Sequence, residues 1–180
     1  MSSVPSSHPR PFAISTAAAQ HDSARSPTYR LFHTSSLLAP AIARVVLGVV
    51  ILPHGAQKLL GWFGGYGFTG TMTWFTDTVH VPWLLGFGVI LTESLGGFML
   101  LAGFASRLLA LALAAVFASA AIMIHAPHGF FVNWLGNQKG EGVEYFVLGV
   151  ALCVIVAVYG GGAWSVDRWI TRRPGKSRSL

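Results

Sequence analysis

Long apolar runs, separated by short polar or glycine-rich stretches, dominate the chain from about residue 37 to residue 161. A helix that crosses a membrane needs roughly 20 predominantly apolar residues. Four segments approach or exceed that length, and each is predicted to be a membrane-spanning helix: residues 37–61, 83–103, 108–124 and 145–161. The pattern therefore predicts an all-α fold, a four-helix transmembrane bundle, over residues 37–170.

The segments between the predicted spans are short or rich in aromatic residues. The glycine- and aromatic-rich stretch after the first span is predicted to be an interfacial loop with a short amphipathic helix over residues 71–79. The loop after the third span offers similar aromatic anchors, among them Phe130 and Trp134. Only a few residues around Arg107 join the second and third spans, which predicts an antiparallel helical hairpin.

Two tails flank the predicted bundle. Residues 1–36 are rich in Ser, Ala and Pro and have too few large apolar residues to form a core, so they are predicted to be a disordered cytoplasmic tail. They lack the short apolar core of a secretory signal, whereas their arginine and serine content also fits an organellar transit peptide. Residues 171–180 are predicted to be a basic cytoplasmic tail.

Composition and charge support a membrane protein. The chain is 53% hydrophobic and 10% charged, whereas soluble domains carry about 25% charged residues. The net charge of +6 comes mostly from the tails, which favours membrane topology over nucleic-acid binding. Basic residues gather on one side, so both termini are predicted to be cytoplasmic. The single cysteine, Cys153, forms no disulfide or CxxC pair within one chain and is predicted to be buried.

Several ionisable residues lie inside or next to the apolar spans. Each costs about 2.5–3.5 kcal/mol at the centre of a spanning helix, so each is a functional hypothesis. His54 and Lys58 are four residues apart and share a helix face, with Gln57 beside them. The topology predicts that this face meets mid-span Glu93 in a cavity that opens outward, near His125, His128 and Glu144.

Structural interpretations exist for most of these residues. Snorkelling to the headgroups is an alternative explanation for Lys58, and snorkelling inward or pairing with Glu93 is one for Arg44. His125 and His128 also fit an interfacial loop, and Glu144 fits a partner of a helix dipole. Glu93 cannot snorkel from mid-span, so it is predicted to be protonated or paired.

Three sequence runs resemble the DoxX family of small four-helix membrane proteins. They are ARVVLGVVILPHGAQKLLGWFGGYGFTGT, LTESLGGFMLLAGFASRLLAL and HAPHGFFVNW with a following EY. The resemblance covers about residues 40–170, with the motif positions Arg44, His54, Gly55, Lys58, Glu93, Gly97, Arg107, His128, Gly129 and Glu144. It implies a four-helix bundle in the plasma membrane and a link to sulfur chemistry, since close relatives oxidise thiosulfate to tetrathionate and pass the electrons to quinone. It also implies soluble or membrane redox partner subunits.

Two functions account for these features equally well. The first is a subunit of a membrane oxidoreductase that acts at the quinone level, on thiosulfate or related sulfur species. Glu93, His54 and Lys58 are its predicted catalytic residues, and its substrate or quinone pocket is predicted to contain Arg44, Gln57, Trp62, His125, His128, Phe130, Trp134 and Glu144. The alternative is a non-enzymatic scaffold of a redox complex, or a carrier of protons or small solutes.

Other ligands and partners are less favoured. A metal or haem site centred on His125 and His128 is the weakest hypothesis, because Pro127 interrupts the helix and no spacing fixes a full ligand set; no metal is therefore predicted. Quinone is the predicted electron acceptor, and the predicted surroundings are the lipid bilayer and redox subunits, with homo-oligomers left open.

Overall fold

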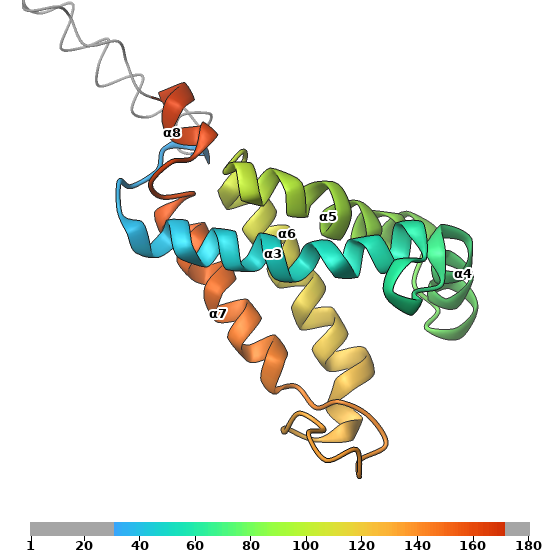
Figure 1. Cartoon of the computed structure of the whole chain (residues 1–180). Helices are drawn as coiled ribbons and strands as arrows, with labels where there is room; N and C mark the ends of the chain where they lie inside the picture. Colours follow the sequence, from blue (N-terminus) through green and yellow to red (C-terminus); the bar gives the residue numbers. More distant parts are fainter. Residues whose placement is uncertain (1–30, 172–180) are drawn as a thin grey trace, which may run out of the picture. The chain divides into compact units, whose positions relative to one another are not determined.

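The computed structural model describes residues 31–171, and within this range the chain is helical with no strand. The prediction of an all-α bundle is confirmed. The expected disordered tail over residues 1–36 and the basic tail over residues 171–180 lie almost entirely outside the described residues. In chain order, the helices are α3 (Leu38–Leu60), η1 (Trp62–Gly64), α4 (Gly67–Thr73), η2 (Trp74–Thr78), α5 (Trp83–Ala102), α6 (Ser106–Ala120), η3 (Ala121–His125), η4 (Ala126–His128), α7 (Glu144–Tyr159) and α8 (Val166–Thr171) (Figure 1).

Three helical segments among the described residues are long and apolar enough to cross a membrane by length and composition. They are α3, α5 and the continuous segment from Ser106 to His128, in which the π-helix η3 and the 3-10 helix η4 extend α6. The fourth predicted span corresponds to α7, which is apolar but has only 16 residues. Such a helix is about 24 Å long, shorter than the hydrocarbon core of roughly 30 Å.

The four long helices form two closely packed pairs, α3 with α5 and α6 with α7. Figure 1 shows α5 and α6 leaving their shared turn in different directions, so the predicted helical hairpin diverges instead of packing along its length. Each helix buries one narrow stripe with spacings of three and four residues, which is the pattern of helices packed at shallow angles. These stripes include Ala41, Arg44, Gly48, Ile51 and Gly55 on α3; Gly86, Ile90, Glu93, Gly97 and Leu100 on α5; Ser106, Ala110, Leu113 and Phe117 on α6; and Gly149, Cys153 and Val156 on α7.

The remaining faces of these helices are apolar and exposed, as expected for surfaces in contact with lipid. Leu84 on α5 and Leu148 on α7 are 72% and 64% exposed. Cys153 is buried at 1% exposure, so the prediction for this residue is confirmed. The segment between α3 and α5, for which a short helix over residues 71–79 was predicted, is helical from Gly67 to Thr78.

Glycines allow α3 and α5 to approach each other closely. A Cβ atom placed on Gly55 would lie 2.6 Å from backbone atoms of Glu93 and Ser94. One Cβ on Gly97 would lie 2.9 Å from the Leu52 side chain. The helix backbones are therefore in direct contact where α3 passes Glu93, which is the packing that small residues permit in membranes.

A single buried arginine ties the opposite end of the bundle together. Arg44 is 3% exposed, and all five of its N–H donors point at backbone carbonyl oxygens. Two belong to Leu100 and Leu101 in the last turn of α5, where a cation also complements the helix dipole. The other three belong to the segment between α7 and α8, namely Gly161, Ala163 and Trp164.

Asp167 secures the same end from α8. Its carboxylate accepts hydrogen bonds from the backbone N–H groups of Ala105 and Ser106, at 2.7 and 2.9 Å, and so caps the start of α6. It also interacts electrostatically with Arg44. Arg107 adds a further connection, because its side chain donates to the carbonyls of His33 and Ala157. We call this region the Arg44 end of the bundle.

We expect Gly55→Ala to destabilise the protein by about 1–3 kcal/mol, the usual cost of overpacking. The added methyl group would meet the backbone of α5 and push it away from α3. Thermal unfolding in detergent micelles, followed by circular dichroism, measures the effect. Gly88→Ala is the matched control on α5, since its Cβ has no neighbour within 4 Å. Equal midpoints for the two variants would contradict the close contact.

We expect Arg44→Lys to be more harmful than its conservative appearance indicates. An ammonium has three donors where the guanidinium has five, so at least two buried carbonyls lose a partner, at about 1–3 kcal/mol each. The same unfolding measurement applies, with Arg168→Lys as control, because Arg168 binds Ser165 through its backbone N–H, which a lysine keeps. A wild-type midpoint for Arg44→Lys would show that the carbonyls do not need the guanidinium.

Candidate functional site

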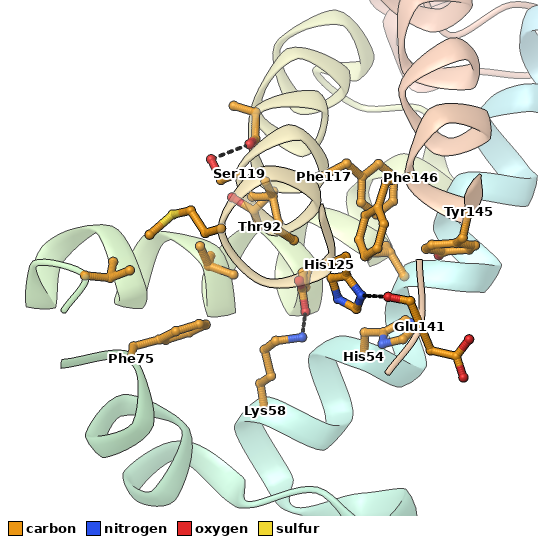
Figure 2. A pocket seen from close by; sticks show the side chains of 18 of the residues that line it. His54, Lys58, Phe75, Thr92, Phe117, Ser119, His125, Glu141, Tyr145 and Phe146 are labelled. Carbon is orange, nitrogen blue, oxygen red and sulfur yellow. Dashed lines mark hydrogen bonds and ion pairs between the residues drawn. The ribbon is translucent and has the colours of Figure 1, made fainter. Parts of the chain in front are cut away.

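A cavity of about 990 Å³ lies between the two helix pairs, away from the Arg44 end. Helices α3, α5, α6 with η3, and α7 all contribute to it, as does the loop before α7 (Figure 2). Its wall is mainly apolar and includes Ile51, Phe75, Leu84, Leu85, Val89, Val116, Phe117, Met123, Phe146 and Leu148. We call it the large cavity. Its size falls in the range of pockets that hold organic ligands of drug size.

Lys58 and Glu93 form an ion pair in this cavity, with the ammonium nitrogen 2.6 Å from Oε2 of the carboxylate. The Glu93 side chain is 6% exposed and that of Lys58 is 25% exposed. The pair forms because Gly55, just under one turn before Lys58 on α3, lets the backbone of α5 approach at Glu93. Glu93 was predicted to be either protonated or paired, and the structure shows it paired. The Lys58 ammonium binds Glu93 and does not extend to the headgroups.

Two histidines line the same cavity. His54 lies one turn before Lys58 and interacts electrostatically with both members of the ion pair. His125 comes from the other helix pair, at the end of η3. Its Nδ1 lies 2.9 Å from the carbonyl oxygen of Glu141, and its ring lies 4.4 Å from that of Phe146 (Figure 2). The predicted convergence of His54, Lys58, Glu93 and His125 is therefore present in the structure.

Tyr145 adds a polar group that the sequence reasoning did not single out. It lies in the first turn of α7, its ring centroid is 6.5 Å from that of His54, and it lines the large cavity. Its hydroxyl oxygen is buried and has no hydrogen-bond partner within residues 31–171. A buried hydroxyl without a partner costs about 1–3 kcal/mol, so this group has an unused capacity to bind a ligand. The only sequence signal for it was its place after Glu144 in the EY pair.

The charge of the large cavity is more negative than the sequence alone indicated. Lys58 is neutralised by Glu93, and Glu141 and Glu144 also line the wall. These two carboxylates accept hydrogen bonds from the loop backbone, Glu141 from Asn133 at 2.6 Å and Glu144 from Val132 at 3.2 Å. Glu144 therefore orders the loop before α7 in addition to lying at a helix N-terminus.

Five residues predicted for the pocket lie elsewhere or at its margin. Arg44 neither lines the cavity nor pairs with Glu93, because its donors are all taken by carbonyls at the opposite end of the bundle. Trp62 is 61% exposed and packs edge-on against Phe63. Gln57 lines a second, smaller pocket and donates a hydrogen bond to the Phe63 carbonyl. The ring of His128 lies against Gly140. Phe130 packs edge-on against Phe131.

Trp134, the last of the predicted residues, lines the large cavity although it is 84% exposed. The side chains of His125 and His128 both lie against the loop before α7, the first at the Glu141 carbonyl and the second at Gly140. Across residues 31–171, no three or more His, Cys, Asp or Glu side chains are grouped so that they could hold a metal ion.

Comparison with known proteins gives one family. The family model described as DoxX matches residues 39–126, which include α3, α5, α6 and the cavity residues His54, Lys58, Glu93 and His125. The motif positions His128, Gly129 and Glu144 lie beyond this match, which is shorter than the resemblance over residues 40–170. The searches of curated proteins and of solved structures gave no match. Residues 39–126 thus match the DoxX family, and three helical segments among residues 31–171 are long and apolar enough to cross a membrane.

Proposed function

We propose that this protein is the membrane subunit of an oxidoreductase that acts at the quinone level, and that the large cavity binds the quinone. The observation that carries the proposal is a buried Lys58–Glu93 ion pair beside an unpartnered tyrosine hydroxyl in an otherwise apolar cavity. A quinone combines an apolar ring and tail with two carbonyl oxygens. Such a ligand matches a wall of this composition with a few polar groups.

The polar groups have distinct roles in this proposal. The Tyr145 hydroxyl donates a hydrogen bond to one ligand oxygen, and the Lys58 ammonium is available to the same end of the cavity. A bound quinone supplies the capacity to accept two electrons and two protons. Lys58 and Glu93 hold a proton between them, and His54 lies beside the pair to exchange protons with it. The apolar wall excludes bulk water around them.

The electron donor is expected to act outside the large cavity. The DoxX resemblance implies thiosulfate or a related sulfur species, two molecules of which release two electrons when they form tetrathionate. Three glutamates and one lysine are among the residues that line the cavity, namely Glu93, Glu141, Glu144 and Lys58. A dianion is repelled by this balance of charge. We therefore place sulfur oxidation at a partner subunit, from which electrons pass to the cavity.

The alternative function is a scaffold of a redox complex or a carrier of protons or small solutes. The same ion pair and histidines then serve as a relay across the bundle. The two functions differ in one respect that can be measured, since only the oxidoreductase requires saturable binding and reduction of a quinone.

We expect the wild-type protein in nanodiscs to bind a short-chain quinone saturably, which quenching of tryptophan fluorescence can follow. Tyr145→Phe should raise Kd about 2- to 10-fold, the value of one hydrogen bond. It should not lower the unfolding temperature, because the hydroxyl has no partner to lose. Tyr159→Phe is the matched control, on an exposed site of the same helix. An unchanged Kd for Tyr145→Phe would remove this residue from the proposed site.

We expect thiosulfate-dependent reduction of quinone in host membranes to depend on Glu93. Deletion of the chain should abolish the reaction, wild-type protein should restore it, and Glu93→Gln at normal abundance should restore about 1% of it. This loss of about 100-fold lies within the range of about 10²- to 10⁴-fold that a group transferring a proton contributes to a reaction rate. The absorbance change of the quinone measures the rate. If deletion leaves the rate unchanged, the oxidoreductase role is wrong, and the scaffold or carrier function is favoured.

A further inference from the structure

A second pocket of about 240 Å³ lies next to the large cavity, on the side of the loop that joins α3 to α4. We call it the small pocket. It is lined by Gln57, Lys58, Gly64, Gly65, Tyr66, Thr71, Trp74 and Phe75. Since a water molecule in the liquid occupies about 30 Å³, the pocket has room for several waters. Its lining residues include the amide of Gln57 and the hydroxyls of Tyr66 and Thr71 as partners for them.

Lys58 and Phe75 line both the small pocket and the large cavity. Glu93 lines only the large cavity, where it holds the Lys58 ammonium. The Phe75 ring packs against the backbone of α5, because a Cβ atom on Gly86 would lie 3.0 Å from it. The Lys58 side chain therefore extends from the small pocket to the large cavity. Phe75, which also borders both, is only 7% exposed.

The two spaces differ in what surrounds them. The large cavity is bounded by helix faces whose neighbouring residues are exposed and apolar, such as Leu84 and Leu148. The small pocket lies under a loop whose Trp62 and Tyr66 are exposed, and these residue types concentrate where a membrane meets water. An apolar ligand and a proton would thus approach Lys58 from different sides.

We propose that the small pocket is a water-filled proton entrance to Lys58, separate from the opening through which the ligand enters the large cavity. This inference rests on the proposed function. When the Lys58 ammonium gives one proton to an oxygen of the ligand, it becomes a neutral amine. A water in the small pocket gives one proton back to that amine and regains one from the aqueous phase. One proton moves inward in each cycle, and no electron passes through the pocket.

Phe75 acts in this arrangement as the partition between the two spaces. Its ring keeps water of the small pocket away from the apolar wall while the Lys58 side chain passes beside it. Without the ring, the two spaces would join and the two routes to Lys58 would no longer be distinct.

The test compares two cysteine variants in a Cys153→Ala background. Tyr66→Cys places a thiol on the small pocket and Trp134→Cys places one on the large cavity, at sites of matched exposure, 80% and 84%. Each thiol is blocked with a bulky maleimide in nanodiscs. The protein is then treated with methyl acetimidate, a small water-soluble reagent for amines, and modification of Lys58 is followed by mass spectrometry. The exposed Lys139 is the internal reference.

We expect the block at Tyr66→Cys to slow Lys58 modification at least tenfold and the block at Trp134→Cys to slow it less than twofold. Adding Phe75→Ala to the Tyr66→Cys variant should make the block ineffective, because Lys58 is then reached from both sides. The inference is overturned if the two blocks act in the reverse order or equally, or if Lys58 in the unblocked protein is not modified. The assay contains no quinone, so its failure is separate from a failure of quinone binding.

Discussion

The buried guanidinium of Arg44 organises one end of the bundle. Its donors join the end of α5 to the segment that follows α7, and Asp167 adds the start of α6. These groups are backbone polar atoms at helix termini, which have no partners within their own helices. In a bilayer, such atoms cannot turn to water, so a cation with five donors replaces solvent for them. The cost of burying Arg44 is offset because every donor is used.

The connection at this end explains why a cavity forms at the other. Close contacts run along α3 with α5 and along α6 with α7, through Gly55 and Gly149 among others. The pairs meet at the Arg44 end and diverge from it (Figure 1). The space between them widens toward His54 and Tyr145, which therefore face a cavity instead of a neighbouring helix. The fold thus combines a rigid polar junction with an open apolar space.

Much of this architecture follows from periodicity and length, and part of it does not. The apolar runs predicted the long helices. The spacing of His54 and Lys58 predicted a helix face that meets mid-span Glu93, but it left open whether Glu93 is protonated or paired. Arg44 was misread, because a charge in an apolar run predicts a partner but not whether that partner is a carboxylate or a set of carbonyls. Tyr145 was overlooked, because an unpartnered hydroxyl is a property of packing and has no pattern in the sequence.

The electrostatics of the large cavity limit the class of ligand that would fit it. Lys58 is already paired with Glu93, and Glu141 and Glu144 leave the wall with an excess of negative charge when the histidines are neutral. An anion would lose its hydration and meet repulsion, whereas a neutral ligand keeps the gain from apolar contact. The free hydroxyl of Tyr145 then selects for an acceptor on that ligand. The ligand should therefore be uncharged, be largely apolar and offer a hydrogen-bond acceptor. A neutral apolar molecule with carbonyl oxygens meets these three conditions, whereas a sulfur anion meets only the third.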